Sequence, residues 1–148
     1  MGNSAVDFFT KEQKEAIKQA VQQAEKETSG EIRVHVENTC EGDVLDRAAT
    51  VFDKLGMVQT ELRNGVLFYV ALKSHKFAIL GDLGINAKVP QNFWESTKEI
   101  IIEHFRKGLF AEGLIEGITM AGKELKQWFP YQTDDVNELP DDISFGKK

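Results

Sequence analysis

The chain has little of the chemistry that marks several large classes of protein. It contains a single cysteine, Cys40, among 148 residues, so no disulfide can form within the chain, which suits a reducing compartment. It also lacks an excess of positive charge, because 18 Lys and Arg face 24 Asp and Glu and leave a net charge of −6. An acidic chain without a basic patch repels phosphate backbones, so nucleic-acid binding is disfavoured.

Long hydrophobic runs are absent as well. The longest, residues 66–72, is far too short to cross a bilayer, so we expect no membrane insertion. Residues 1–9 contain no basic segment followed by an apolar stretch, and we therefore expect no signal peptide. These observations together favour a soluble, cytoplasmic monomer.

What is present is enough apolar material for one packed domain. Hydrophobic residues make up 41% of the chain, and 148 residues is the size of one ordinary domain. Residues 131–148 carry acidic side chains with few apolar anchors. We expect a single domain over residues 1–130, followed by an acidic, loosely ordered tail over 131–148.

Hydrophobic periodicity indicates both helices and strands. Thr10 and Gln13 form a capping-box pattern at the start of a helix. Residues 31–37 alternate between apolar and polar, which is typical of a half-exposed strand, whereas 66–72 is apolar on both faces and predicts a central strand. The predicted elements are a helix from Thr10 to about residue 28, strands at 31–37, 66–72 and 76–80, and helices at 43–55, 90–108 and 111–129.

The order helix–strand–helix–strand–strand–helix–helix favours an α/β fold, a three-layer α/β/α sandwich around a small mixed sheet. A helical crossover makes the first two strands parallel, and a hairpin makes the third antiparallel to the second. Glu31 begins the first strand, Arg63 precedes the second and Asp82 follows the third, while Asp53 ends the intervening helix. We therefore expect carboxylates from separate elements to meet at one end of the sheet.

Three segments of the chain resemble the TPM domain family, which includes a thylakoid-lumen protein of photosystem repair and a modulator of acetylcholine receptors. They are residues 45–57, 63–71 and 77–85, and the most specific part is Asn64-Gly-Val-Leu followed by a strand, a turn, a second strand and a glycine-rich loop. The resemblance covers most of the chain. It implies a small sheet between helices, and it makes divalent-metal binding an expectation and phosphatase activity an alternative, because both have been ascribed to some members.

The chain also departs from the family pattern. Many members carry a signal peptide and a membrane anchor, neither of which is expected here. The common glycine–tyrosine–glycine turn is replaced by Gly81-Asp82-Leu83-Gly84.

Asp82 is the sharpest candidate metal ligand. Gly81 and Gly84 allow backbone carbonyls to approach its carboxylate, and hard cations such as Ca²⁺ and Mg²⁺ require such oxygen-rich surroundings. The alternative is that Asp82 only caps a turn, with Gly84 supplying a positive φ. The full set of predicted metal ligands is Asp82, Glu31, Asp53 and Asn64.

Arg63, Asn64 and Gly65 allow two interpretations. Arg63 can form an anion clamp beside turn amides, or it can pair with Asp53 or Asp82 while Asn64-Gly65 turns the chain into the central strand. Cys40 lies between a strand and a helix, as the nucleophile of thiol phosphatases does, but those enzymes need Arg six residues later. Asp46 stands at that position and Arg47 one place further, so Cys40 is expected to be a passive thiol.

The sequence therefore predicts a Ca²⁺- or Mg²⁺-binding TPM-like domain that acts as a non-enzymatic interaction or assembly module, with another protein as a possible partner. The alternative is a metal-dependent phosphatase, in which the ion polarises a phosphoryl group and Arg63 balances its charge.

Overall fold

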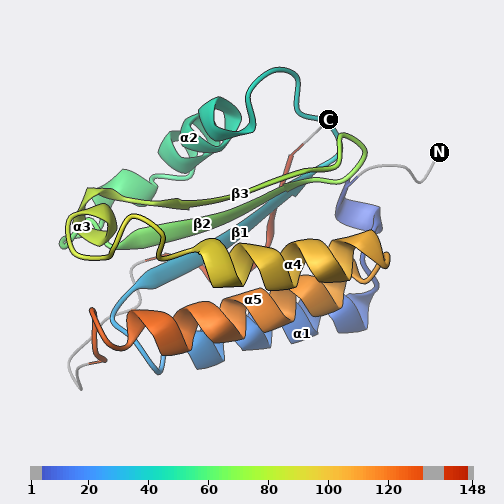
Figure 1. Ribbon diagram of the computed structural model, residues 1–148. Coiled ribbons are helices and arrows are strands. Elements are labelled where there is room, and N and C mark those ends of the chain that lie inside the picture. Colours follow the sequence, from blue (N-terminus) through green and yellow to red (C-terminus); the bar gives the residue numbers. More distant parts are fainter. Residues whose placement is uncertain (1–4, 132–138, 147–148) are drawn as a thin grey trace.

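The computed structural model describes residues 5–131 and 139–146 (Figure 1). Within them the chain forms an α/β fold around one small sheet, as the sequence predicts. The helices are η1 (Ala5–Asp7), α1 (Lys11–Ala24), α2 (Val44–Lys54), η2 (Met57–Gln59), α3 (Leu83–Asn86), α4 (Glu95–Arg106) and α5 (Phe110–Leu125), and the strands are β1 (Glu31–Glu37), β2 (Gly65–Ala71), β3 (Lys76–Gly81) and β4 (Ser144–Phe145).

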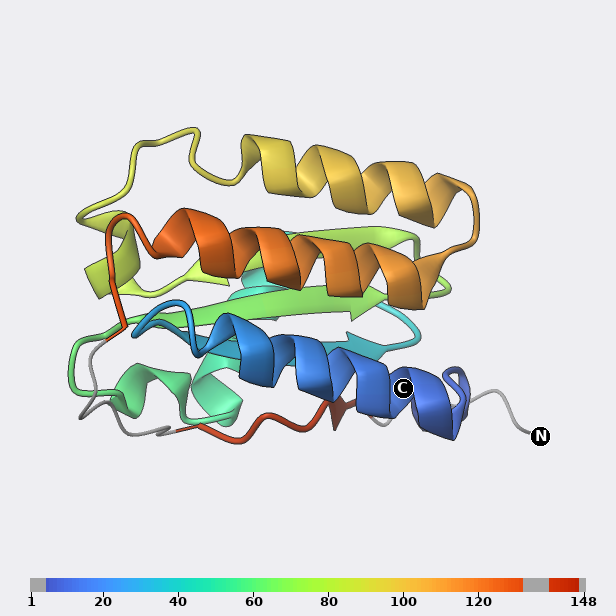
Figure 2. The same ribbon diagram turned by 90° about the horizontal axis from the view of Figure 1, so that it is seen from below.

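The sheet is mixed and has the strand order β3-β2-β1-β4. β1 and β2 are parallel, from Glu31 opposite Gly65 to Glu37 opposite Ala71, and β3 returns antiparallel to β2. Helices α1, α4 and α5 form a layer on one face of the sheet, and α2 covers the other face (Figures 1 and 2). The predicted three-layer arrangement is therefore confirmed.

β2 is the centre of the protein because both of its faces are buried. Phe68 packs into the core beneath the helical layer, while Tyr69 packs into a second core beneath α2. Burying each large side chain of this kind stabilises a fold by about 1.5–3 kcal/mol. The unbroken apolar run of the sequence follows from this position, since a strand covered on two sides has no solvent face.

Local sequence determines how α1 begins and how it meets α5. The hydroxyl of Thr10 accepts a hydrogen bond from Gln13 N (3.0 Å), and the Gln13 side chain accepts one from Thr10 N (2.9 Å), so the predicted capping box is present. At the other end of α1, Gly122 of α5 lies against Ala24, and a Cβ at Gly122 would come 2.8 Å from the Ala24 Cβ. The two helices approach closely because both residues are small.

The helices differ from the sequence-based expectation at several points, since α1 ends at Ala24 instead of about residue 28 and α5 at Leu125 instead of residue 129. The helix predicted from Pro90 begins at Glu95, because residues 90–94 form turns in which Phe93 N donates to Pro90 O (3.0 Å). The loop predicted at 81–89 contains the short helix α3, whose first turn is capped by Asp82. No helix of the described residues is long and apolar enough to cross a bilayer.

Part of the predicted acidic tail lies outside the described residues, namely 132–138 and 147–148. Residues 139–146 run beside β1, where Ser144 and Phe145 form β4, a strand that the sequence analysis did not predict. Gly146 N donates to Val36 O (2.9 Å), which extends this pairing by one residue. The outer edge of β1 is thus covered by the chain's own C-terminal segment.

Candidate functional site

The candidate site begins with a paired arginine and aspartate at the end of β3. Arg63 Nε donates to Asp82 Oδ2 and Arg63 Nη2 donates to Asp82 Oδ1, both at 2.7 Å. The Asp82 residue is 6% exposed, whereas the Arg63 side chain is 40% exposed. Because the pair is bidentate, it fixes orientation as well as charge, and the hydrogen bond that Arg63 donates to Asp82 holds the pKa of Arg63 above its ordinary value.

The backbone around Arg63 explains why the two side chains meet. Arg63 adopts a left-handed conformation (φ 51°), which turns the chain sharply before it enters β2. Its carbonyl accepts a hydrogen bond from Gly84 N (2.8 Å), so α3 is attached directly to this turn. Asp82 also accepts a hydrogen bond from Leu83 N (2.8 Å) and thereby caps α3. The capping role that the sequence left open is therefore present together with the ion pair.

Gly84 has a different role from the one considered in the sequence analysis. It is not among the residues with positive φ, so it does not supply a left-handed turn. A Cβ at this position would instead overlap the carbonyl oxygen of Leu62 and lie 2.6 Å from that of Arg63. Glycine is required here by close backbone approach.

Asn64 follows Arg63 in the chain and is buried, with 3% of its surface exposed. Its side-chain amide donates to Ser29 O (2.7 Å), and its backbone N–H donates to the Thr60 hydroxyl (3.2 Å). Its Oδ1 is buried, with no hydrogen-bond donor among the described residues. A buried, unpaired oxygen of this kind is uncommon in folded proteins, and it is available as an acceptor or as a ligand.

The other predicted ligands are not brought into one cluster. Asp53 is exposed on α2, and the guanidinium of Arg63 pairs with Asp82 rather than with it. Glu31 is 5% exposed, and one of its carboxylate oxygens accepts a hydrogen bond from Leu139 N (3.2 Å). Within the described ranges, no group of three or more His, Cys, Asp or Glu side chains could hold a metal ion.

Gly65 lies between Glu31 and Asp82 in the sheet. Because it has no side chain, the space on that face of the sheet is filled by other residues. Glu31 is opposite Gly65 in β1, and Asp82 N donates to Gly65 O (2.9 Å) on the other side. A Cβ at Gly65 would be 3.4 Å from Met57 and equally close to Phe52. The space beside Gly65 is therefore filled by apolar side chains.

A second polar cluster lies at the opposite end of β1, and the sequence analysis missed it. Glu37 is 1% exposed and accepts hydrogen bonds from Arg47 Nε (2.8 Å) and Nη2 (2.9 Å), from the Tyr69 hydroxyl and from His35 Nε2 (3.1 Å). Burial by itself would raise the pKa of Glu37, but these donors outweigh it and lower the pKa to about 2.

The alternation of residues 31–37 places His35 and Glu37 on one face of the strand and predicts that this face is half-exposed. The face is buried in the structure because α2 and residues 139–146 cover it. His35 Nδ1 lies 2.9 Å from the Ser144 hydroxyl, and burial lowers the pKa of His35. A neutral ring can therefore donate through Nε2 to Glu37 and accept through Nδ1 from Ser144. The sequence of one strand does not show that a segment more than 100 residues later in the chain packs against it.

A third ionisable group lies where the C-terminal segment meets α1 and β1. Glu25 Oε2 accepts a hydrogen bond from Ile32 N (2.9 Å). Burial, followed by a side-chain hydrogen bond to Asp141, raises the pKa of Glu25 to about 10. Glu25 is therefore protonated at neutral pH and can donate to the Asp141 carboxylate.

Comparisons with known proteins agree with the fold. The family model of the TPM domain matches residues 3–124. The chain is similar to the BA42 protein of the psychrophilic bacterium Bizionia argentinensis, whose structure was determined by NMR, with 50% identity, a TM-score of 0.90 and coverage of 94% of this chain and 96% of that one. It also shares its fold with the N-terminal domain of a P. gingivalis protein, at 19% identity and a TM-score of 0.69, over 84% of this chain and 82% of that one. A search of curated proteins gave no match.

The family match spans most of the residues that form the sheet and its helices, including Arg63, Asn64 and Asp82. The resemblance noted in the sequence therefore extends to the whole architecture. The chain belongs to the TPM domain family.

Proposed function

We propose that this TPM domain is a non-enzymatic interaction module whose state is set by a divalent cation, Ca²⁺ or Mg²⁺, bound at the end of β3. Asp82 provides the carboxylate and Asn64 provides the amide oxygen Oδ1. The observation that carries the proposal is the Asn64 Oδ1, which is buried without a donor among the described residues. It belongs to the residue that follows Arg63, the cationic partner of Asp82. Oxygen atoms of these two kinds are the ligands that both ions prefer.

In this proposal the guanidinium of Arg63 occupies the place of the cation. Its side chain is 40% exposed, so the guanidinium can move into solvent while the cation takes its place beside the buried Asp82 carboxylate. Asp82 can then exchange one positive partner for another while continuing to cap α3 through Leu83 N. Because the site has few protein ligands, water molecules complete the coordination, and the affinity is correspondingly low.

The same geometry favours binding over hydrolysis. In the proposed complex Asp82 holds the cation and still accepts a hydrogen bond from Leu83 N, so this carboxylate is poorly placed to accept a proton from water. Cys40 is 5% exposed and lies in the apolar core beneath α2, which is unsuitable for a nucleophile. The phosphatase alternative predicts metal-dependent hydrolysis of p-nitrophenyl phosphate that is lost in Asp82→Asn, and we expect no such hydrolysis.

The experiment is an amide NMR titration with CaCl₂ and with MgCl₂ on the wild-type protein and three variants. We expect saturable shifts at residues 63–65 and 81–85. Asp82→Asn should abolish them, and Arg63→Gln should tighten binding because it removes the competing cation. Asp53→Asn is the matched control, since this exposed carboxylate lies outside the proposed site and its loss should change nothing.

Two results would contradict the proposal. One is the absence of saturable shifts in both salts. The other is equal weakening by Asp53→Asn and Asp82→Asn, which would indicate diffuse attraction of cations to an acidic surface. Binding that weakens in Arg63→Gln would show that the arginine supports the site instead of competing for it.

A further inference from the structure

The outer edge of β3 carries backbone groups that point away from the sheet. β3 is the last strand on its side, and Asp82 N donates to Gly65 O (2.9 Å), so Asp82 faces β2. Antiparallel strands alternate between residues that face the partner and residues that face outward. Phe77, Ile79 and Gly81 therefore direct their N–H and C=O groups outward, because they alternate with residues that face β2.

Only one end of this outward row is closed by a side chain. The Gly81 carbonyl accepts a hydrogen bond from the Asn86 side-chain amide (3.0 Å). No strand lies beyond Phe77 and Ile79 in the described part of the chain. Phe77 is half-buried and Ile79 is 5% exposed, so the accessible part of this unpaired edge is centred on Phe77, and another strand can add there.

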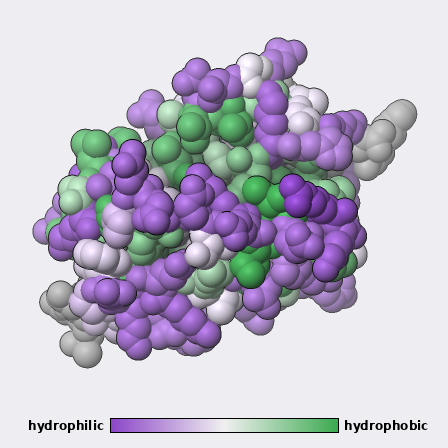
Figure 3. All heavy atoms as spheres, in the orientation of Figure 1, coloured by the Kyte–Doolittle hydropathy of each residue, from purple (hydrophilic) through white to green (hydrophobic). Residues whose placement is uncertain are grey.

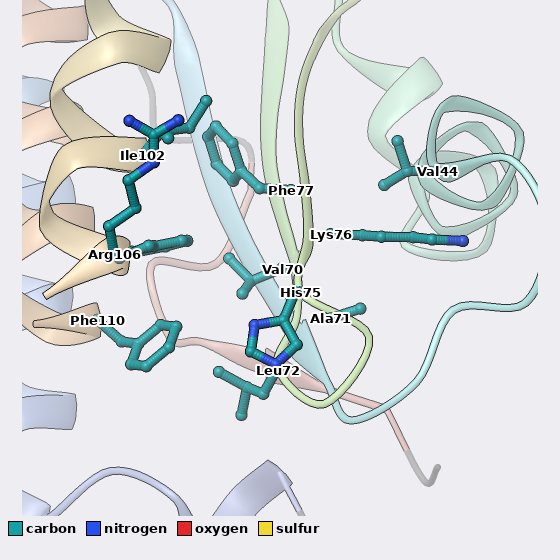
Figure 4. Close-up of a pocket in the computed structure, with 11 residues that line it drawn as sticks. Val44, Val70, Ala71, Leu72, His75, Lys76, Phe77, Ile102, Arg106 and Phe110 are labelled. Carbon is teal, nitrogen blue, oxygen red and sulfur yellow. The ribbon is translucent and has the colours of Figure 1, made fainter. Parts of the chain in front are cut away.

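Proteins often place a lysine on such an edge to prevent pairing with another strand. Lys76 lies at this edge, but its side chain points elsewhere. The ammonium group of Lys76 donates to the carbonyls of Cys40 (3.1 Å) and Gly42, on the side of α2. Figure 4 shows its side chain extending away from Phe77. The lysine therefore stabilises the loop before α2 and leaves the edge open.

A cavity of about 460 Å³ surrounds this edge on both faces of the sheet. Phe77, Ile102 and Phe110 line it on the side of the helical layer, and Val44 with Ala71 lines it on the side of α2 (Figure 4). Hydrophobic atoms gather in the band between α2 and the helical layer, along which β3 runs (Figures 1 and 3). A strand placed beside β3 would send alternate side chains to these two faces, because side chains alternate along a strand.

The cavity also carries a positive group with no acidic partner among the described residues. Arg106 lines it, with the imidazole of His75 nearby, and neither side chain makes an ion pair or hydrogen bond with the described residues. The chain as a whole has a net charge of −6, so an unpaired arginine here is distinctive. An acidic group on the incoming strand would complement it.

We propose that the edge of β3 is a docking site for an extended segment of a partner protein, which adds as a strand beside Phe77 and Ile79. Its alternate apolar side chains enter the cavity, and an acidic side chain or a terminal carboxylate lies near Arg106 and His75. Backbone hydrogen bonds supply affinity, and the cavity supplies selectivity. The site is at the hairpin end of β3, and it does not depend on cation binding near Asp82.

The opposite edge of the sheet shows what kind of segment this fold accepts. There β4 adds to β1 through only two residue pairs, yet Phe145 is half-buried, with Lys14 5.3 Å from its ring centroid. A short strand with one aromatic anchor is thus held at an edge of this sheet. The cavity beside β3 provides an equivalent place for an apolar anchor, but its neighbouring edge is open.

The test is selection of a phage-displayed library of random nine-residue peptides on the full chain. We expect enriched sequences with alternating apolar residues and at least one Asp or Glu. Phe77→Pro removes the outward N–H while keeping the inward ladder to β2, since proline is tolerated on an edge strand. Phe77→Val is the matched control, because it also lacks the ring but retains the N–H.

Synthetic copies of the enriched peptides are then titrated by amide NMR. Binding should slow hydrogen exchange at Phe77 and Ile79, and it should weaken about fivefold or more in Phe77→Pro relative to Phe77→Val, the loss expected for one hydrogen bond. Arg106→Gln should weaken acidic peptides by a similar factor, whereas Lys123→Gln on the exposed face of α5 should not.

Three outcomes would overturn the proposal. The first is a selection without enrichment. The second is equal binding of the same peptides to Phe77→Pro and Phe77→Val, which would place them elsewhere. The third is a dimer, detected by sedimentation, that is lost in Phe77→Pro and kept in Phe77→Val. That last result would assign the edge to a second copy of this chain.

Discussion

Arg63 and Asp82 face each other through two hydrogen bonds of 2.7 Å although 19 residues separate them in the chain. Their meeting depends on two backbone features, the left-handed turn at Arg63 and the hydrogen bond from Gly84 N to Arg63 O. The pair therefore reports on how β2 and α3 are held together. Changes to this backbone should disturb the site without touching either side chain.

Gly84→Ala should be the most disruptive small substitution at the site. Its Cβ would overlap Leu62 O and lie 2.6 Å from Arg63 O, and backbone atoms cannot move aside as a flexible side chain can. We expect a loss of about 1–3 kcal/mol in the free energy of unfolding, measured by urea denaturation, together with altered amide shifts at residues 63–65. Gly42→Ala is the control, because its φ of 79° costs strain but its Cβ meets nothing within 4 Å. A wild-type amide pattern at 63–65 in Gly84→Ala would contradict this account.

Glu37→Gln should lower stability at neutral pH. The substitution leaves the guanidinium of Arg47 beside a neutral group in a buried setting, and we expect a loss of about 2–4 kcal/mol in the free energy of unfolding at pH 7. The folded-state pKa of Glu37 lies at about 2, below its ordinary value of 4.5, so its contribution is present above pH 4.5 and disappears as the pH falls toward 2.

Denaturation from pH 7 to pH 2 would measure that contribution. The difference between wild type and Glu37→Gln should shrink across the interval from pH 4.5 to 2. Glu116→Gln, an exposed substitution on α5, serves as the control and should follow the wild type throughout. A difference that does not vary with pH would mean that the lost stability comes from packing instead of charge.

Glu25→Gln should raise the stability of the folded protein at alkaline pH, whereas Glu37→Gln lowers it at neutral pH. The pKa of Glu25 is raised to about 10 in the folded protein, so folding binds a proton and the wild type loses stability as the pH rises above 4.5. Glutamine can still accept from Ile32 N and can donate permanently to Asp141. We expect Glu25→Gln to be more stable than the wild type by about 1–3 kcal/mol at pH 8 and equal to it near pH 4. Thermal denaturation at the two pH values measures this, and a variant that is less stable at pH 8 would refute it.

Gly146→Ala should release β4 from β1. A Cβ at Gly146 would lie 2.6 Å from the Glu37 Cβ and still closer to its carboxylate. We expect faster hydrogen exchange at Phe145 and Gly146, and a loss of about 1–2 kcal/mol in the free energy of unfolding. Ser144→Ala is the milder control, since it removes only the hydroxyl beside His35. Unchanged exchange at Phe145 in Gly146→Ala would show that the segment adapts to the extra methyl group.

The elements that the sequence predicted well are those whose cause is local. The capping box at Thr10 involves groups three residues apart, and the run over β2 reports burial of both faces of a single strand. The parallel pairing of β1 and β2 follows in the same way from the helical crossover between them, because that connection has one favoured hand. Sequence alone therefore determined the layers and most of the strand order.

The candidate site was determined only in part. Chain order placed Asp82 and Arg63 at the same end of the sheet, but it could not show that Met57 and Phe52 fill the space beside Gly65 or that Asp53 faces solvent. These facts depend on which side chains fill the space above Gly65, a residue with no side chain of its own. Such packing follows from three-dimensional shape and leaves no periodic pattern in the sequence.

The tertiary structure alone decided what covers each edge of the sheet. β4 adds to β1 through two residue pairs from the far end of the chain, and its few apolar residues give no detectable alternation. Together with α2, that segment buries Glu37 and His35, although alternation predicts a half-exposed face. The opposite edge, at Phe77, has no further strand beside it in the described residues. The sequence of a strand shows which of its side chains share a face. Which segments pair with the strand or cover it depends on the tertiary structure of the whole chain.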